Sequence, residues 1–170
     1  MSISFVLGGA RSGKSRFAEN KAKLSAKKVI YFATATAGDA EMSERIAFHQ
    51  VDRPDDWQTI EEPVELTKIL RKIDADDKCI LVDCLTLWVT NLLCAENEQQ
   101  QKNEIEKLLE FLPHAKADII FVSNEVGHGI VPLGEINRRF VDESGRLHQQ
   151  ISILADEVEF IMAGLPLKLK

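Results

Sequence analysis

The sequence is poor in cysteine, and none of its apolar runs is long enough to cross a membrane. Its three cysteines, Cys79, Cys84 and Cys94, form an odd set without a C-x-x-C spacing. Two of them lie in or beside an apolar run, where cysteine usually packs as a small apolar residue. Met1 and Ser2 lead directly into the first expected strand, so we expect no signal peptide and no membrane anchor. These features favour the reducing cytoplasm.

The sequence also lacks a cluster of basic residues and any linker-like segment. Its formal net charge is −6, and its lysines and arginines are scattered, which argues against a general binder of nucleic acid or of anionic membranes. Neither internal repeats nor a stretch rich in Pro, Gly and Ser divide the chain. We therefore expect residues 1–170 to form a single nucleotide-binding domain with a core of ordinary size.

What the chain does have, close to its start, is a complete phosphate-loop pattern, G-x-x-x-x-G-K-[S/T]. The apolar run 3–7 before it predicts a buried strand, and residues 15–27 after it predict a helix. Glycines let the loop turn its N–H groups toward phosphate oxygens, and the positive helix N-terminus also favours anions. Lys14 is expected to reach the β- and γ-phosphates, and the Ser15 hydroxyl to ligate Mg²⁺. The nucleotide-binding residues expected from this loop are Gly8, Gly9, Ala10, Arg11, Ser12, Gly13, Lys14 and Ser15.

The rest of the chain alternates apolar runs with helical periodicity, which specifies an α/β fold of the P-loop NTPase type. We expect a mostly parallel sheet with helices on both faces and a short antiparallel edge strand at 167–169. Strands are predicted at 28–33, 57–62, 79–83, 117–122 and 157–162. Helices are predicted at 39–52, 63–73, 84–94, 105–112 and 134–155, with 96–102 read as an exposed loop or a helix start.

Two strand ends carry candidate ligand-binding residues. Asp83 ends an apolar strand, which is the Walker B arrangement for an acid that holds Mg²⁺ directly or through water. Apolar runs that end in Asp are common, so the phosphate loop upstream is what favours this interpretation. Thr34, Ala35 and Thr36 follow the second strand, and ligands of open α/β sheets lie at such carboxyl ends.

Three later segments, read together with the phosphate loop, point to a family. They are Ala33-Thr34-Ala35 with Glu41-Met42-x-x-Arg45-Ile46-x-x-His49-x-x-x-Arg53-Pro54, Val82-Asp83-Cys84-Leu85-Thr86 with Thr90-Asn91-Leu92-Leu93, and Asn124-Glu125-Val126-Gly127-x-Gly129-Ile130-Val131-Pro132. In this order they closely resemble the bifunctional adenosylcobinamide kinase/adenosylcobinamide-phosphate guanylyltransferase family of cobalamin biosynthesis. The resemblance runs from Gly8 to the C-terminus.

This resemblance implies two successive reactions. The family phosphorylates the aminopropanol hydroxyl of adenosylcobinamide with ATP or GTP. It then transfers GMP from GTP to that phosphate through a guanylylated histidine, giving adenosyl-GDP-cobinamide and pyrophosphate. The nucleophile falls on His49, where a neutral imidazole is a competent nucleophile near neutral pH. Phe48 stands where some members have a second histidine, and His128 is given no catalytic role. The resemblance also implies a homotrimer. The very apolar helix 84–94 is expected to be buried in the core or at a subunit interface, where Leu85–Leu93 would suit a subunit contact, and Trp88 within it is expected to pack and not to bind a cofactor.

Several other polar residues have two interpretations each. Arg53 pairs with triphosphate oxygens, or it compensates charge at a helix C-terminus. Glu61 and Glu62 accept hydrogen bonds from guanine N1–H and N2–H₂, or they are solvated acids. Arg11 contacts phosphate or a neighbouring chain, and Glu125 acts on substrate or metal or belongs to a surface loop. His114 and His148 are expected to be structural or exposed.

Two other functions stay open at this point. One is a kinase for another small metabolite in which His49 is passive, and the other is a nucleotide-switched binding module without chemistry.

The two reactions of the leading interpretation also make different demands on one phosphate loop. Phosphoryl transfer presents the γ-phosphorus and guanylyl transfer the α-phosphorus, so either the nucleotide binds in two poses or the His49 helix moves.

Overall fold

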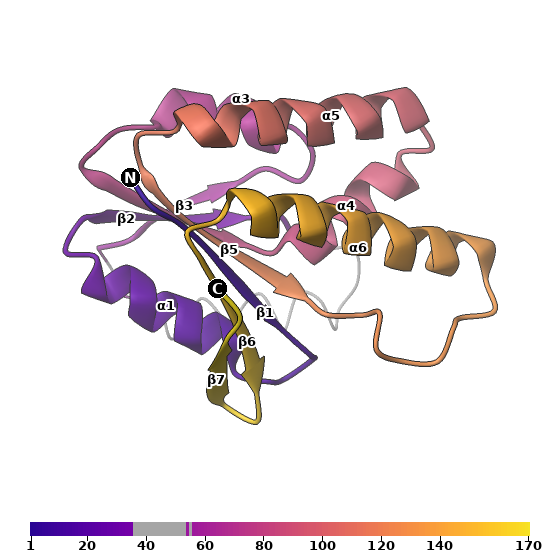
Figure 1. The fold of residues 1–170 in the computed structure, drawn as a ribbon. Helices are drawn as coiled ribbons and strands as arrows, with labels where there is room; N and C mark the ends of the chain where they lie inside the picture. The colour runs from indigo at the N-terminus through magenta and orange to yellow at the C-terminus, as the bar shows by residue number, and fades with distance from the viewer. Residues whose placement is uncertain (36–53, 55) are drawn as a thin grey trace.

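The computed structural model describes residues 1–35, 54 and 56–170, and Figure 1 shows their arrangement. The helix predicted at 39–52 lies outside the described residues. So do three of the predicted site residues, Thr36, His49 and Arg53.

A seven-stranded sheet forms the centre of the molecule, in the order β3-β2-β4-β5-β1-β6-β7. Neighbouring strands run parallel except for β6 and β7, which pair antiparallel at the edge. The predicted mostly parallel sheet and its antiparallel edge strand are therefore confirmed. The strands are β1 (Ile3–Gly8), β2 (Lys28–Ala33), β3 (Gln58–Glu61), β4 (Lys78–Asp83), β5 (Asp118–Asn124), β6 (Glu157–Met162) and β7 (Leu165–Lys168).

Helices cover both faces of this sheet, as expected for strands that are apolar on both sides. Helix α1 lies on one face and α3, α4, α5 and α6 on the other (Figure 1). The helices are α1 (Lys14–Leu24), α3 (Leu66–Ile73), α4 (Leu85–Cys94), α5 (Glu98–Phe111) and α6 (Glu135–Leu154), with the 3₁₀ turn η1 at Leu112–His114.

Two helix starts differ from the prediction, and each difference has a local cause. Helix α3 begins at Leu66 instead of at Pro63, because the Glu62 carboxylate accepts hydrogen bonds from the N–H groups of Val64 and Glu65 and holds this segment as a turn. Helix α5 begins at Glu98, before its apolar periodicity becomes visible. The side chain of Asn97 caps it by accepting from Gln100 N–H at 3.0 Å.

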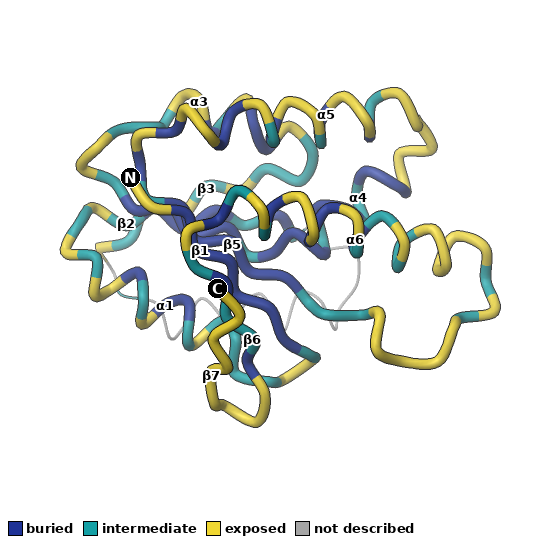
Figure 2. The backbone as a smooth tube through the Cα atoms, in the orientation of Figure 1, coloured by how far each residue is buried: buried dark blue, intermediate teal, exposed yellow. Residues whose placement is uncertain are grey.

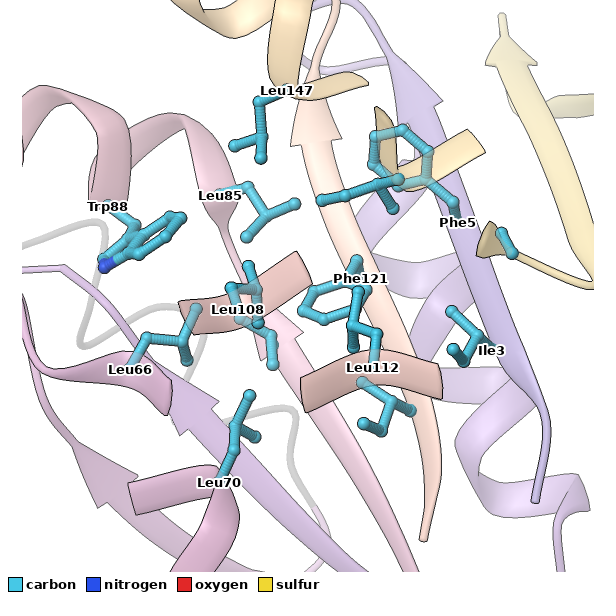
Figure 3. Close-up of a cluster of buried hydrophobic side chains, with 14 of the residues drawn as sticks. Ile3, Phe5, Leu66, Leu70, Leu85, Trp88, Leu108, Leu112, Phe121 and Leu147 are labelled. Atoms are coloured by element: carbon cyan, nitrogen blue, oxygen red, sulfur yellow. The ribbon is translucent and has the colours of Figure 1, made fainter. Parts of the chain in front are cut away.

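The larger part of the core lies between the sheet and helices α3 to α6 (Figures 2 and 3). Trp88 is at its centre with no exposed surface, and its indole N–H donates to the Val64 carbonyl at 2.8 Å. Most apolar side chains of α4 are thus buried within this chain. Of the two alternatives for this helix, the core and a subunit interface, the structure confirms the core, to which α3, α5 and α6 also contribute.

We expect Trp88→Phe to lower the free energy of unfolding by about 1–3 kcal/mol, because the Val64 carbonyl loses its buried donor and the smaller ring leaves a void. Urea denaturation measures this change. Trp57→Phe is the matched control, since Trp57 is only half-buried, and it should cost clearly less. Equal losses in the two variants would contradict the central place given to Trp88.

Candidate nucleotide site

The phosphate loop connects β1 to α1 and folds as a turn that ends on the helix N-terminus. Gly13, the N-cap residue, has φ of 94°, and its carbonyl accepts from Phe17 N–H at 3.0 Å. Lys14 begins the helix, and its ammonium group lies 3.4 Å from the Gly9 carbonyl oxygen. The loop therefore presents helix N–H groups and a lysine ammonium to one region, the arrangement that binds phosphate groups.

The turn between β6 and β7 packs directly against this loop. Gly164 N–H donates to the Ser12 carbonyl at 2.8 Å, and a Cβ on Gly13 would lie 3.3 Å from the Gly164 Cα. A Cβ on Gly8 would approach both the Ser12 hydroxyl, at 2.5 Å, and the Ile161 carbonyl oxygen, at 2.6 Å. Thus the close contact with the C-terminal strands requires glycine at the first position of the loop.

The carboxyl ends of four parallel strands meet at the same edge as the loop. Gly8 is in register with Asn124, Asp83 with Val122, and Ala33 with both Asp83 and Glu61. The sheet thus brings together the predicted residues of the loop, of β2, of β4 and of β3. Open parallel sheets bind their ligands at this edge.

Asp83 lies at the end of β4 and is held by a neighbouring strand. The Tyr31 hydroxyl donates to Asp83 Oδ2 at 3.0 Å. The next residue, Cys84, donates its N–H to the Thr34 hydroxyl at 3.0 Å, and that hydroxyl donates to the Cys84 carbonyl at 2.7 Å. Burial raises the pKa of the Cys84 thiol to about 11, so this cysteine stays a protonated, apolar neighbour of the acid.

Two of the predicted ligand-binding residues have structural contacts of their own. Thr34 is fully buried, and its carbonyl accepts from the Asn91 side chain at 2.8 Å. One carboxylate oxygen of Glu62 accepts from the N–H groups of Val64 and Glu65 in the turn before α3, while Glu61 is exposed at the end of β3. Their roles toward a nucleotide stay predictions, as does that of Ala35.

Sequence reasoning missed a buried polar network behind the end of β5. The Ser123 hydroxyl lies 2.8 Å from His148 Nε2 and 3.1 Å from the Thr86 hydroxyl. Thr86 also accepts the Asn124 N–H at 2.7 Å, and Glu125 N–H donates to the Gly8 carbonyl at 3.0 Å. His148 was expected to be structural or exposed, and it is buried and structural. No spacing in the sequence signals this network, because its members come from three separate elements.

His148 is enclosed by apolar as well as polar neighbours. Its ring meets that of Phe5 edge-on, with 5.4 Å between the centroids. Burial lowers the pKa of His148 below its usual range, and the Glu125 carboxylate, 3.9 Å from Nδ1, opposes this only in part. The neutral imidazole is therefore the form that the folded protein favours.

Comparisons with known proteins place the chain in a family. Residues 4–169 match the family model described as cobinamide kinase / cobinamide phosphate guanyltransferase. The chain belongs to this family. The resemblance predicted from the motifs is confirmed, and with it the assignment to an enzyme family of kinases and guanylyltransferases that takes cobinamide-related small molecules and nucleotides.

Two relatives are similar to this chain over nearly their full lengths. The bifunctional adenosylcobalamin biosynthesis protein CobP of Pseudomonas aeruginosa is 54% identical over 165 residues, covering 97% of this chain and 95% of that protein. The bifunctional adenosylcobalamin biosynthesis protein CobU of Salmonella typhimurium is 39% identical over 178 residues, covering 97% and 98%.

Solved structures support the fold alone. The RadB recombinase has a TM-score of 0.55 at 17% identity, covering 94% of this chain and 73% of that one. The predicted P-loop NTPase fold is confirmed. Among the residues that the structure describes, no helix has both the length and the apolarity needed to span a bilayer.

Substitution of Gly8 by Ala should lower the thermal midpoint of the nucleotide-free protein, because the new methyl group overlaps the Ser12 hydroxyl and the Ile161 carbonyl. Overpacking of this kind costs about 1–3 kcal/mol. The matched control is Gly9→Ala, since a Cβ there meets nothing within 4 Å. Differential scanning fluorimetry of the two variants should separate them, and equal midpoints would contradict the close packing.

Acidification should destabilise the protein through His148. Its pKa is lowered by folding, so below the unfolded value of about 6.5 the unfolded chain binds a proton that the folded chain does not, and stability falls. We expect the thermal midpoint to drop less between about pH 7.5 and about pH 5 in His148→Gln than in the wild type. The exposed His114, changed to Gln, should leave the wild-type slope unchanged. An unchanged slope in His148→Gln would refute the assignment.

Proposed function

We propose that this chain phosphorylates adenosylcobinamide with ATP or GTP and then transfers GMP from GTP to the product, forming adenosyl-GDP-cobinamide. The observation that carries the proposal is the meeting of the phosphate loop, Lys14 and Asp83 at one sheet edge in a member of this family. In the first reaction the corrinoid hydroxyl oxygen bonds to the γ-phosphorus and its proton passes to water. The bond from the γ-phosphorus to the bridging oxygen breaks, and the nucleoside diphosphate leaves with that oxygen. Lys14 and the N–H groups of α1 neutralise charge on the phosphates.

The second reaction is proposed to pass through His49. A ring nitrogen bonds to the α-phosphorus of GTP, and the bond from that phosphorus to the bridging oxygen breaks, releasing pyrophosphate. An oxygen of the corrinoid phosphate then bonds to the same phosphorus, and the P–N bond breaks. The phosphate loop would hold the departing pyrophosphate, and Arg53 would pair with the triphosphate.

The remaining nucleotide contacts are proposed from the positions of the residues in the fold and from the chemistry of their side chains. Glu61 ends β3 and Glu62 follows it, and carboxylate oxygens suit the N1–H and N2–H₂ donors of guanine. The segment 34–36 follows β2 at the same edge. Arg11, with φ of 55° within the loop, is placed for phosphate or for a neighbouring chain.

The described residues fit Mg²⁺ as a nucleotide-bound ion. Asp83 and the Ser15 hydroxyl are hard oxygen ligands, and Mg²⁺ usually takes one or two protein oxygens together with phosphate oxygens and water. The described part of the chain has no cluster of three or more metal-ligating side chains, which such a site does not need. Ser15 and Asp83 would hold the ion, which would supply charge neutralisation at the phosphates.

We also propose the setting in which this enzyme works. Residues 1–170 act as one domain, since β1 pairs with β5 and β6 from the other end of the chain. The three free cysteines, two of them buried, fit a cytoplasmic protein, and the net charge of −6 fits small-molecule substrates better than nucleic acid. A homotrimer is supported by exposed apolar side chains after β5, at Ile130, Val131 and Leu133.

Incubation with GTP labelled at the α-phosphate should label the protein with an acid-labile, base-stable adduct. His49→Ala should abolish the label and guanylyl transfer while keeping at least part of the kinase activity. Lys14→Ala should remove both activities. The control is His114→Ala, an exposed histidine of η1, which should label like the wild type.

The same experiment separates the competing functions. If the wild type phosphorylates adenosylcobinamide but takes up no label, the protein is a kinase without guanylyltransferase activity. Absence of any substrate-dependent nucleotide release would leave a binding module. Guanylyl transfer that survives in His49→Ala would show that another residue is the nucleophile.

A further inference from the structure

Asn124 occupies a position between the two parts of the nucleotide site. It ends β5, the strand that lies between β1 with the phosphate loop and β4 with Asp83. Gly8 is in register with Asn124, and Asp83 with Val122, so Asn124 extends two residues beyond the acid. Because side chains two apart share a face, Asn124 lies on the same sheet face as Asp83.

That face is the one covered by α1, at whose N-terminus the phosphate loop ends. Val122 belongs to the buried cluster that includes Ala18 and Ala22 of α1. Ser123, with the opposite orientation, lies on the other face against Thr86 and His148. The alternation thus directs Ser123 to the α4 and α6 side and the Asn124 amide to the side of the phosphate loop.

The amide oxygen of Asn124 is buried and has no hydrogen-bond partner among the described residues. An unsatisfied buried acceptor costs about 1–3 kcal/mol, so such a group in a native protein calls for an explanation. Its place beside the phosphate loop supplies one, since a bound nucleotide brings hydroxyl groups and ordered water to this edge. The cost is then relieved when the site is filled.

The backbone of Asn124 is held firmly. Its N–H donates to the hydroxyl of Thr86, the second residue of α4, three positions after Asp83. The following Glu125 N–H continues the ladder to the Gly8 carbonyl at 3.0 Å. The buried Ser123–His148 contact supports the strand from behind. Because the residues before and after Asn124 are also held, its backbone loses little conformational entropy when a ligand binds.

We propose that Asn124 is a further residue of the nucleotide site, which contacts the terminal phosphate groups of the bound nucleoside triphosphate. Its NH₂ group donates to a phosphate oxygen. Its carbonyl oxygen accepts from water on those phosphates or from the hydroxyl that is phosphorylated. Thr86, Ser123 and His148 act as positioning residues for it. The inference rests on nucleotide binding at the phosphate loop.

The test measures nucleotide binding and stability in the same full-length variants. Asn124→Ala should keep or raise the nucleotide-free thermal midpoint, because it removes a buried acceptor that has no partner among the described residues. It should weaken GTP binding by about 10- to 100-fold, the loss expected for one hydrogen bond to a charged group. Asn124→Asp should bind GTP at least as weakly, because its charge repels phosphate at unchanged side-chain size.

Ser144→Ala is the matched control. The Ser144 hydroxyl is also buried without a described partner, but it lies within α6, on the face of the sheet opposite to α1 and the phosphate loop (Figure 1). It should keep wild-type GTP affinity and kinase turnover. Calorimetric titration with GTP, steady-state kinase rates and thermal midpoints give the three readouts.

The outcomes separate this inference from the proposed function. Wild-type GTP affinity in Asn124→Ala overturns the inference, and so does a loss of affinity that merely follows a lowered nucleotide-free midpoint. Tighter GTP binding by Asn124→Asp than by Asn124→Ala overturns the phosphate contact. If the wild type itself fails to bind GTP, or Lys14→Ala binds it equally well, the proposed nucleotide site fails first and the inference with it.

Discussion

The parallel register of β1, β5, β4 and β2 is the constraint on which the site depends. Backbone hydrogen bonds align Gly8 with Asn124 and Asp83 with Ala33, so residues far apart in the sequence end at one edge. Because the strands are buried between α1 and the helices of the other face, a slip in register would expose apolar side chains (Figure 2). Packing of the hydrophobic core thus fixes the strand register, and the register fixes the positions of the phosphate loop and Asp83 relative to each other.

Buried polar contacts stiffen the same edge where the apolar core ends. Thr34 joins the end of β2 to that of β4, and Thr86 joins α4 to β5. A buried hydroxyl without a hydrogen-bond partner costs free energy, so these contacts favour the observed arrangement of the strand ends over arrangements that would break them. The β6–β7 turn adds a third support through Gly164 and Ser12. The edge is therefore preorganised before any nucleotide binds, which lowers the entropic cost of binding.

Local chemistry made much of this structure predictable. The apolar runs predicted the strands to within about two residues, since each is long enough to be buried and is bounded by polar or glycine-containing turns. Two helix starts were less accurate or left open, because they depend on single side chains: Glu62 holds the turn before α3, and Asn97 caps α5 within the segment 96–102, predicted as a loop or a helix start. Trp88 was correctly predicted as a packing residue. The sequence leaves open whether its helix packs in the core or at a subunit interface, because the identity of a helix's partner is not contained in its own periodicity; the structure shows the core.

The sequence by itself determined the phosphate loop and the family. The loop rests on residue types at a short spacing that phosphate binding requires, and the family on that loop together with three later motifs in a fixed order. Only the tertiary structure decided that His148, Ser123 and Thr86 meet. It also placed Asn124 in register with Gly8, with an amide oxygen that has no partner in the described part of the chain. Such pairings join α4, β5 and α6 across long stretches of chain. They follow from the order and register of the strands, which arise from the packing of the whole sheet and are not encoded in any one segment.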